Sequence, residues 1–570
     1  MLTLPILNDI KTKQEMVKAF GGYSHNLVIG QKEFFDMKNM SSDLAPVLSP
    51  RKPRGILRSI AKPNGIHSHE ELMWVDGTEL YYAGKKVANV SDSPKQFVNM
   101  GAYVCIFPDK TMYNTHTGEY TQLECKTSTS ATVTVTLCRD DGSEYGDLPT
   151  GSTAPESPQD ADLWIDTSAD PVVLKQYSTV NGGWISMPTT YVRIFSKGIG
   201  RGFSEYDGVT ISGLANDSLN GEFIIQSASE DFIVIIGIVD ETLMQDETVT
   251  VSRTVPDFDF VCESENRLWA CSSEKSEIYA SKLGDPKNWR VYMGISTDSY
   301  TATIGSSGDF TGCCRHNGYV YFFKEHIIHR VYGTKPANFK LTEINALGVE
   351  AGSDKSMQVI NEILYYKSRE GIFAITSSVP ENISYAFGAE KYRNARGGMY
   401  GQKYYVCMDD GNGVSHVFVY DTQRGMWHKE DDANAIGFAE VGRDLYFIAD
   451  GFLYSVGGTL DKYGEEPRLE KNVPWMVETG DIGLDDPDHK YISKLQLRME
   501  VGEGATLCIE TKEGGFGDWR ERARRGFTRK TAMTVPIIPM RCDTMKIRIS
   551  GRGDCKIYSL AKVTESGSEY

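Results

Sequence analysis

The sequence lacks an apolar segment long enough to cross a membrane as a helix. Its longest uncharged apolar run, Phe232–Val239, has eight residues, whereas a spanning helix needs roughly 20. The first residues, Met1 to Pro5, lack the basic start and the cleavage site of a secretory signal. We therefore expect no membrane span and a protein that folds in a cytoplasm.

Spaced metal-binding or disulfide motifs are also absent. The eleven cysteines are odd in number and include no C-x-x-C pair, so we expect reduced, packed thiols. His326 and His329 would lie on opposite faces of a strand, which does not suit one metal ion. His67 and His69 share a face if extended, but no third ligand is suitably spaced. We interpret them as part of a polar loop and predict no metal site.

The chain has no surplus of basic residues. It contains 60 Lys and Arg against 77 Asp and Glu, for a net charge of −17. Neutralising phosphates supplies most of the affinity of a nucleic-acid binder, so this charge argues against a protein that reads DNA sequence. An acidic wall past which DNA slides without sticking is compatible with it.

One basic cluster interrupts this acidic background near the C-terminus. Its members are Arg520, Arg522, Arg524, Arg525, Arg529 and Lys530, and a single acidic residue, Glu521, stands between the first two. We predict that they lie in a hairpin loop, which is either solvated or in contact with an acidic partner. Contact with DNA is a further alternative, which the net charge disfavours.

Catalytic signatures are missing as well. None of the repeats described below carries the Ser-x-Asp-x-Gly-x-x-Trp turn of sialidases, and Gly198–Gly202 lacks the Lys-Ser/Thr ending of a phosphate loop. Acidic residues such as Asp76 and Asp450 stand beside glycine, which is typical of turn formers. We predict no catalytic residue and no cofactor.

What the sequence does contain is a repeated pair of strands. An alternating aromatic and aliphatic strand, a tight polar turn and a second strand ending on Tyr or Phe recur five times. The five copies start at Leu268, Tyr319, Ile363, Tyr404 and Leu445. These starts lie 51, 44, 41 and 41 residues apart, which is the spacing of one four-stranded blade of a β-propeller. Two earlier copies, at Leu72 and Tyr103, raise the expected number of blades to six or seven.

The repeated strands are apolar on both faces. Successive side chains of a strand point to opposite faces, yet every residue from Leu445 to Ile448 is apolar. Stacked blades cover both faces, whereas a sheet with one solvated face would alternate. The repeat therefore predicts an all-β propeller. We expect Gly55–Ile60 to pair with the blade that contains Leu445–Tyr454, because closing the ring removes open sheet edges.

Changes in pattern divide the chain into six parts. These are an N-terminal arm (1–45), the first part of the propeller (46–125), an insertion of one or two small β modules (126–255), the remainder of the propeller (256–458), a linker (459–473) and a C-terminal β-sandwich (474–570). The sandwich is expected because Leu495, Leu497 and Met499 alternate with polar residues. In the insertion, Trp164 and Trp184 bracket a hairpin and form either its core or a platform for sugar rings.

Two regions of the chain resemble a known family. The stretch Phe34–Asp43, followed by Pro46–Arg51, resembles the opening of the nozzle or tail-stabilisation proteins of short-tailed (podovirus-type) bacteriophages. The segment Glu265–Ala270, with Ile278–Ser281 and Gly284–Trp289, is similar to the most recognisable segment of that group. The likeness covers residues 20–125 and 256–458, and a looser one follows the propeller.

The resemblance implies a structural virion protein without enzymatic activity. Members of this family contain a propeller and form a ring, usually of six subunits, below the portal-adaptor, where they close the tail channel and guide DNA during ejection. The implied partners are further copies of the chain, the head-to-tail connector and the fibre, spike or tip proteins, with DNA passing transiently and without sequence preference. The implied location is the virion tail, after synthesis in the bacterial host cytoplasm. We expect the basic cluster to lie outside the channel.

The insertion at 126–255 departs from the family pattern and leaves a role in fibre binding open. The alternative function is a tail-associated protein that binds glycans or degrades polysaccharides on a propeller scaffold.

Overall fold

The computed structural model describes residues 11–376, 379–484, 490–514, 517–526, 531–536 and 542–566. In these ranges the only helical segments are four 3₁₀ turns, η1 (Asp217–Leu219), η2 (Pro336–Asn338), η3 (Asp354–Ser356) and η4 (Tyr385–Phe387). No helix in this described part is long and apolar enough to span a membrane. Nearly everything else of regular structure is strand, which confirms the predicted all-β class.

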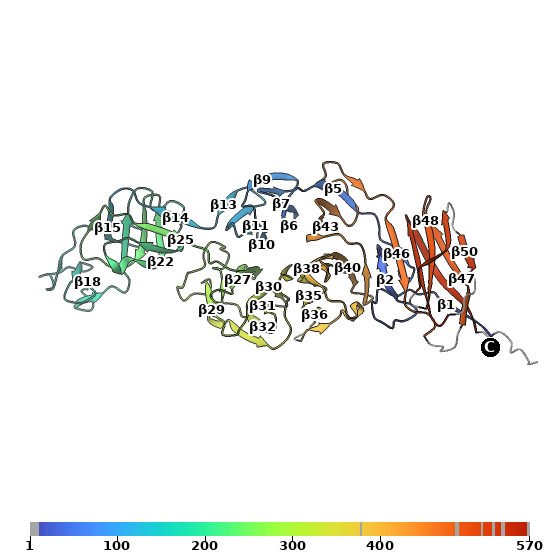
Figure 1. The fold of residues 1–570 in the computed structure, drawn as a ribbon. Coiled ribbons are helices and arrows are strands. Elements are labelled where there is room, and N and C mark those ends of the chain that lie inside the picture. Colours follow the sequence, from blue (N-terminus) through green and yellow to red (C-terminus); the bar gives the residue numbers. More distant parts are fainter. Residues whose placement is uncertain are drawn as a thin grey trace, which may run out of the picture. The chain divides into compact units, whose positions relative to one another are not determined.

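Seven antiparallel sheets have the blade topology that the repeats predict, and in six of them the strands are adjacent in the order of the sequence (Figure 1). Three of them are β6 (Pro63–His69), β7 (Glu71–Asp76), β8 (Glu79–Tyr82) and β9 (Lys85–Asn89); β10 (Gln96–Met100), β11 (Tyr103–Phe107), β12 (Thr111–Asn114) and β13 (Tyr120–Gln122); and β26 (Phe260–Ser264), β27 (Arg267–Ser272), β28 (Glu277–Ala280) and β29 (Tyr300–Thr303).

Three more sheets follow in the second half of the repeat region. They are β30 (Phe310–His316), β31 (Tyr319–Lys324), β32 (Ile328–Tyr332) and β33 (Lys340–Ile344); β34 (Gln358–Ile360), β35 (Ile363–Ser368), β36 (Gly371–Ile375) and β37 (Glu381–Asn382); and β38 (Arg393–Tyr400), β39 (Lys403–Asp409), β40 (Ser415–Asp421) and β41 (Met426–Lys429). The seventh sheet contains β42 (Ala435–Val441), β43 (Asp444–Ala449), β44 (Phe452–Ser455), β5 (Gly55–Ser59) and β45 (Arg468–Leu469).

The second strand of a blade is buried on both faces, as its composition predicts. Every residue of β43 and of β27 is buried. Tyr405 and Val419 of one blade pack against Leu445 and Phe447 of the next, so each sheet covers the face of its neighbour. Burying two apolar faces in this way removes far more apolar surface from water than a single solvated sheet would.

The seventh sheet combines strands from distant parts of the sequence. Strand β5 pairs antiparallel with β44, with Ser59 opposite Phe452 and Gly55 opposite Ser455. The predicted pairing of Gly55–Ile60 with this blade is therefore confirmed for Gly55–Ser59. A sheet that begins with β42 is thus completed by residues nearly 400 positions earlier in the chain.

The chain forms two compact units. One comprises residues 1–95, 308–330 and 342–570, and the other comprises residues 96–307 and 331–341. In the first unit β34 contacts β38, β38 contacts β42, and β42 contacts β6. In the second unit β10 contacts β26. Within each unit, the first strand of one blade therefore lies beside the first strand of another.

The insertion forms two sheets in the second unit. The larger has eight strands, in the order β14 (Cys125–Ser128), β25 (Thr250–Arg253), β21 (Gly208–Ser212), β22 (Gly221–Ser229), β23 (Phe232–Ile236), β20 (Tyr191–Phe195), β15 (Val133–Cys138) and β24 (Leu243–Gln245). The smaller contains β16 (Thr150–Gly151), β17 (Leu163–Asp166), β18 (Val173–Ser178) and β19 (Gly183–Ser186). Val133, Ile194 and Ile235 belong to a core of their own in the larger sheet, as expected for an independent module.

Two sheets form the C-terminal sandwich, and each takes one strand from the N-terminus (Figure 1). The first contains β1 (Lys11–Val17), β52 (Cys555–Ser566), β47 (Lys490–Val501) and β50 (Thr531–Pro536). The second contains β2 (Phe34–Lys38), β46 (Pro474–Thr479), β51 (Met545–Arg552), β48 (Thr506–Glu513) and β49 (Arg520–Gly526). A two-stranded pair, β3 (Met40–Ser41) and β4 (Ser49–Pro50), follows β2.

The structure differs from the sequence interpretation in two segments here. Residues 1–45, expected as an arm, supply β1 and β2 to the sandwich, because strands with one open edge gain a full ladder of hydrogen bonds by pairing. His67 and His69 lie in β6 rather than in a polar loop, with His67 opposite Met73 and His69 opposite Glu71. The first strand of a blade lacks the aromatic pattern that identified the second.

Two buried arginines join the N-terminal segment to the rest of the first unit. Arg54 binds Glu430 at 2.6 Å and Asp431 at 2.8 Å. Arg51 binds Glu470 at 2.6 Å and Asp431 at 3.1 Å. These five residues are called here the arginine clasp, and its two arginines lie in the chain directly before β5. Burial raises the pKa of the Asp431 carboxyl, but the charges of Arg54 and Arg51 outweigh this and hold the pKa below its ordinary value.

Deleting residues 1–60 should lower the thermal stability of the chain strongly, because it removes β1, β2, β5 and both arginines of the clasp. The measurement is the unfolding temperature of the purified protein. The matched control replaces residues 140–189 by a short turn, since β15 already pairs with β20 through Cys138 and Tyr191. We expect the control to unfold near the wild-type temperature. An unchanged unfolding temperature after the N-terminal deletion would show that these strands do not hold the fold together.

Replacing Arg54 by Met should destabilise the first unit by about 3–5 kcal/mol, because it leaves the buried Glu430 and the partly buried Asp431 without one of their cations. Urea unfolding followed by tryptophan fluorescence measures the change. The control is Lys462→Met, since Lys462 forms an exposed pair with Glu71 at 3.0 Å and should contribute less than about 1 kcal/mol. Equal effects of the two substitutions would contradict the argument.

Candidate interaction sites on the C-terminal sandwich

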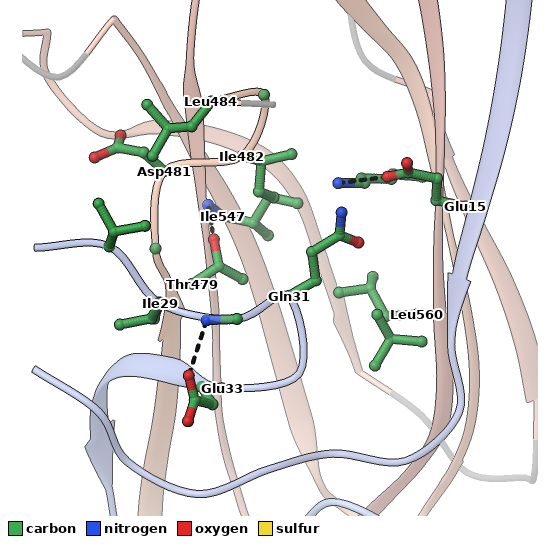
Figure 2. Close-up of a pocket in the computed structure, with 16 residues that line it drawn as sticks. Glu15, Ile29, Gln31, Glu33, Thr479, Asp481, Ile482, Leu484, Ile547 and Leu560 are labelled. Carbon is green, nitrogen blue, oxygen red and sulfur yellow. Dashed lines mark hydrogen bonds and ion pairs between the residues drawn. The ribbon is translucent and has the colours of Figure 1, made fainter. Parts of the chain in front are cut away.

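An apolar pocket of about 340 Å³ opens where the N-terminal strands meet the sandwich (Figure 2). Ile547 of β51 and Leu560 of β52 contribute to its walls, together with Ile29 and Ile482 from two loops. Residues of β51 alternate between buried and partly exposed, and this alternation directs Ile547 to the buried side, whereas Leu560 lies in a buried run of β52. The pocket has the size of a site for a small apolar group or side chain.

Polar groups at the pocket are paired with one another. Glu15 binds Lys562 at 2.8 Å and Lys13 at 2.7 Å. Burial raises the pKa of Glu15, but the hydrogen bonds from Lys13 and Lys562 outweigh it and lower the pKa from 4.5 to about 2. The Gly30 amide donates to Glu33 at 2.8 Å, and the Ile547 amide donates to the Thr479 hydroxyl at 3.0 Å. These groups are engaged in structure, so the pocket is suited to apolar contact rather than to proton transfer.

The rim of this pocket is apolar and exposed. Val28 and Leu484 of its lining are 74% and 55% exposed, and Leu27, next to Val28 in the chain, is 93% exposed. Exposed aliphatic side chains grouped beside a pocket indicate a contact surface. The apolar run Leu27–Ile29 is a local sequence signal for this surface, but it lies outside the blade repeat and was not used to predict a site.

The predicted basic cluster lies in a strand and not in the loop that the sequence suggested. Arg520, Arg522, Arg524 and Arg525 belong to β49, which pairs only with β48 among the described strands. Charged residues in an edge strand give a pattern that resembles a polar loop, because one strand edge and much of its surface face water. Arg529 and Lys530 lie outside the described residues.

The arginines of β49 differ in their surroundings. Arg522 is nearly buried and binds the carboxylate of Glu513 and, at 2.7 Å, the hydroxyl of Thr511. The Arg524 side chain is 70% exposed and binds Glu521 at 2.7 Å. Arg525 is exposed. Arg522 therefore fixes the strand, while Arg524 and Arg525 present charge to solvent.

A second hollow, the basic groove, lies across the sheet that contains β49. Its volume is about 640 Å³. Its charged lining residues are Lys38, Arg524, Arg525, Arg552 and Glu510. Small or short side chains such as Thr506 and Ser550 also line it. Four basic side chains against one acidic side chain suit an anionic partner.

The two tryptophans of the insertion contact each other in the small β16–β19 sheet, where Trp164 is buried and Trp184 is partly exposed. The Trp164 side chain is only 5% exposed, and its ring nitrogen donates to the carbonyl of Gly151 at 3.1 Å. Its ring meets Trp184 edge-on, with centroids 5.5 Å apart, and Trp184 in turn meets Tyr177 at 5.5 Å. Rings that pack on one another in this way leave little flat aromatic surface for a sugar.

Several buried carboxylates of the described chain are neutralised by a nearby arginine or lysine. Asp207 pairs with Arg253 in the insertion, and Glu430 pairs with Arg54. A general acid of a glycosidase needs a raised pKa and a second carboxylate across a substrate cleft. These paired carboxylates have structural partners instead.

Comparisons with known proteins give a fold likeness only. No family model and no curated protein sequence matches the chain. An exo-β-1,3-galactanase from Phanerochaete chrysosporium is similar over 53% of this chain and 94% of its own, at 8% identity and a TM-score of 0.22. Raptor from Chaetomium thermophilum is similar over 70% of this chain and 29% of its own, at 10% identity and a TM-score of 0.28.

A GH43 glycoside hydrolase engineered for both endo-xylanase and exo-arabinofuranosidase activity is similar over 53% of this chain and 97% of its own, at 9% identity and a TM-score of 0.22. Two of the three named structures are thus enzymes that act on carbohydrates. TM-scores of this size carry no argument about what the present chain does.

Acid should weaken the attachment of β1 through Glu15. The folded-state pKa of Glu15 is about 2 against an ordinary 4.5, so its contribution to stability is present above about pH 4.5 and is lost as the pH falls towards 2. We expect Glu15→Gln to unfold at a lower temperature than the wild type at pH 7 and at nearly the same temperature at pH 2. Glu156→Gln, at an exposed position, is the control. A difference for Glu15→Gln that stays constant with pH would refute the argument.

Proposed function

We propose that this chain is a structural subunit of a short-tailed bacteriophage tail, of the nozzle or hub type. In this proposal it assembles as a ring below the portal-adaptor, closes the tail channel and lets DNA pass. The family resemblance over residues 20–125 and 256–458 is the starting point. The structure adds support through the positions of the residues that carry the resemblance.

The observation that carries the proposal is that the resembling segments hold elements together. In the first of them, Met37 and Met40 are buried in the core shared by the sandwich and the neighbouring blades. The Ser42 hydroxyl donates to Asp421 of β40 at 2.6 Å, and Arg51 belongs to the arginine clasp. The residues that carry the family resemblance here hold elements of the fold together and do not line a substrate site. This role favours a scaffold protein.

The second resembling segment has the same character. Arg267 donates to the carbonyls of Ser281 and Ser296, each at 2.7 Å, and so holds the connection between β28 and β29. Trp289, in that connection, is buried, and its ring nitrogen donates to the carbonyl of Pro286 at 2.9 Å. Both segments therefore stabilise connections of the blades.

Net charge is consistent with a channel wall. With a charge of −17, an acidic surface repels phosphates and releases no counterions, so DNA would pass without being retained. The basic groove and the apolar pocket lie on the sandwich, and we assign them to contacts with neighbouring proteins rather than to the lumen.

A second candidate function is glycan binding or polysaccharide degradation on the propeller scaffold. One observation favours it. Trp519, only partly buried, lies under the guanidinium of Arg548, whose central carbon is 3.9 Å from the ring centroid. An accessible aromatic ring beside charged groups can stack on a sugar. The carbohydrate enzymes named above have the same fold class, but their low TM-scores add nothing to this candidate.

The two functions predict different results for the purified chain. For the tail subunit we expect mass photometry to show weak self-association in isolation, antibodies against the chain to label one end of purified phage particles, and release of reducing sugar from host polysaccharide to stay at background. Hydrolysis that a single carboxylate substitution abolishes would establish the second candidate. Absence of the chain from purified particles would refute the first.

A further inference from the structure

Strand β49 has one edge that no described strand covers. It is the last strand of its sheet and pairs only with β48, from Thr511 opposite Arg520 to Thr506 opposite Gly526. In an antiparallel ladder every second residue directs its N–H and C=O groups away from its one neighbour. These groups can pair with the backbone of an additional strand.

Positive charge borders this edge. Arg524 and Arg525 lie on β49 itself, and Arg552 and Lys38 complete the basic lining of the groove. The other edge strand of the same sheet, β2 (Phe34–Lys38), carries one basic residue, Lys38, and one acidic residue, Asp36, whereas β49 carries four arginines and Glu521. Charge alone would discourage edge-to-edge aggregation, but the groove beside the strand gives a partner's side chains a place to lie.

The arginines of β49 have two different roles: one holds the strand in place, and another forms a surface ion pair that a partner can replace. Arg522 is held by Glu513 and Thr511, which keeps the strand in place. Arg524 pairs with Glu521 at the surface, where both side chains are largely exposed, and such a pair contributes little stability. A carboxylate from a partner can therefore replace Glu521 on Arg524 at low cost.

We propose that β49 binds an extended acidic segment of a partner protein, which adds to the sheet as a further strand. Its backbone pairs with the open edge of β49, and its Asp or Glu side chains contact Arg524 and Arg525, the two exposed arginines at the end of β49. The inference rests on the proposed function only in that the partner would be a neighbour in the tail. Protein rather than nucleic acid is favoured because the open edge offers backbone pairing, which a phosphate chain cannot reciprocate.

Fluorescence anisotropy with the full chain tests the proposal. The probe is a labelled peptide of about eight residues that alternates Glu with Val, long enough to cover one strand. We expect it to bind and a peptide alternating Lys with Val not to bind. Methylating the backbone nitrogens of the Glu peptide that face β49 should weaken binding about tenfold or more, because it removes the donors of the added ladder without changing charge.

The protein variants test the charge component. Arg524→Glu with Arg525→Glu should weaken binding of the Glu peptide about tenfold or more. The matched control is Arg201→Glu with Arg369→Glu, which reverses two partly or largely exposed arginines outside the sandwich and should leave binding unchanged. If the reversal variant does not fold, Arg524→Gln with Arg525→Gln replaces it, and the methylated peptide still tests the wild-type protein.

Three results would overturn the inference. The first is equal binding of the methylated and unmethylated peptides, and the second is equal loss in the control variant. The third is tighter binding of a single-stranded DNA probe than of the Glu peptide, with loss in the reversal variant, which would assign the groove to nucleic acid. If the peptide does not bind but the chain is present in phage particles, the inference alone is refuted. If the peptide binds but the chain is absent from particles, the proposed function is refuted.

Discussion

Two arginines near the N-terminus cannot be buried unless carboxylates from elsewhere in the chain meet them. Arg51 and Arg54 are buried, and the cost of removing a guanidinium from water is offset only where Glu430, Asp431 and Glu470 surround them. Residues 51–54, the turn after β41 and the segment before β46 must therefore come together. A buried ion pair adds little net stability, so its main effect is to determine which segments meet.

Several strand pairings depend on this meeting point. Strand β5 begins immediately after Arg54 and completes the sheet of β42, β43 and β44. Strands β1 and β2 pair with β52 and β46 of the sandwich. N-terminal residues thus hydrogen-bond to a blade and to both sheets of the sandwich, so the same short segment connects the sandwich to the blade of β42–β44.

Aromatic packing makes the same junction rigid. The backbone amide of Tyr23 donates to the carbonyl of Trp427 at 2.6 Å, and Phe387 lies 4.8 Å from both Phe418 and Trp427, measured between ring centroids. Close-packed aromatic rings of this kind resist relative movement. Such a junction suits a building block that presents fixed surfaces, here the apolar pocket and the basic groove, to neighbouring proteins.

The local sequence pattern was sufficient to predict the strands of the blades but insufficient to predict the candidate sites. The strands from Leu445 and Tyr404 were recognisable because burial on both faces demands apolar residues at every position. Strand β6 and strand β49 were assigned to loops, since the first or last strand of a sheet pairs on one side only and tolerates polar residues such as His67 and Arg520. The apolar pocket depends on Ile29, Ile482 and Leu560, which are far apart in the chain and have no shared local pattern.

The sequence by itself determined the strand content, the blade repeat and the acidic charge, because each of these follows from residue type and spacing along the chain. It also indicated the pairing of β5 with β44, since an unpaired apolar strand near a chain end needs a partner. Only the tertiary structure decided that β1 and β2 belong to the sandwich, that the arginines of β49 occupy an open edge, and which carboxylates neutralise Arg51 and Arg54. Those outcomes depend on contacts between residues hundreds of positions apart, and such contacts are set by the packing of whole sheets.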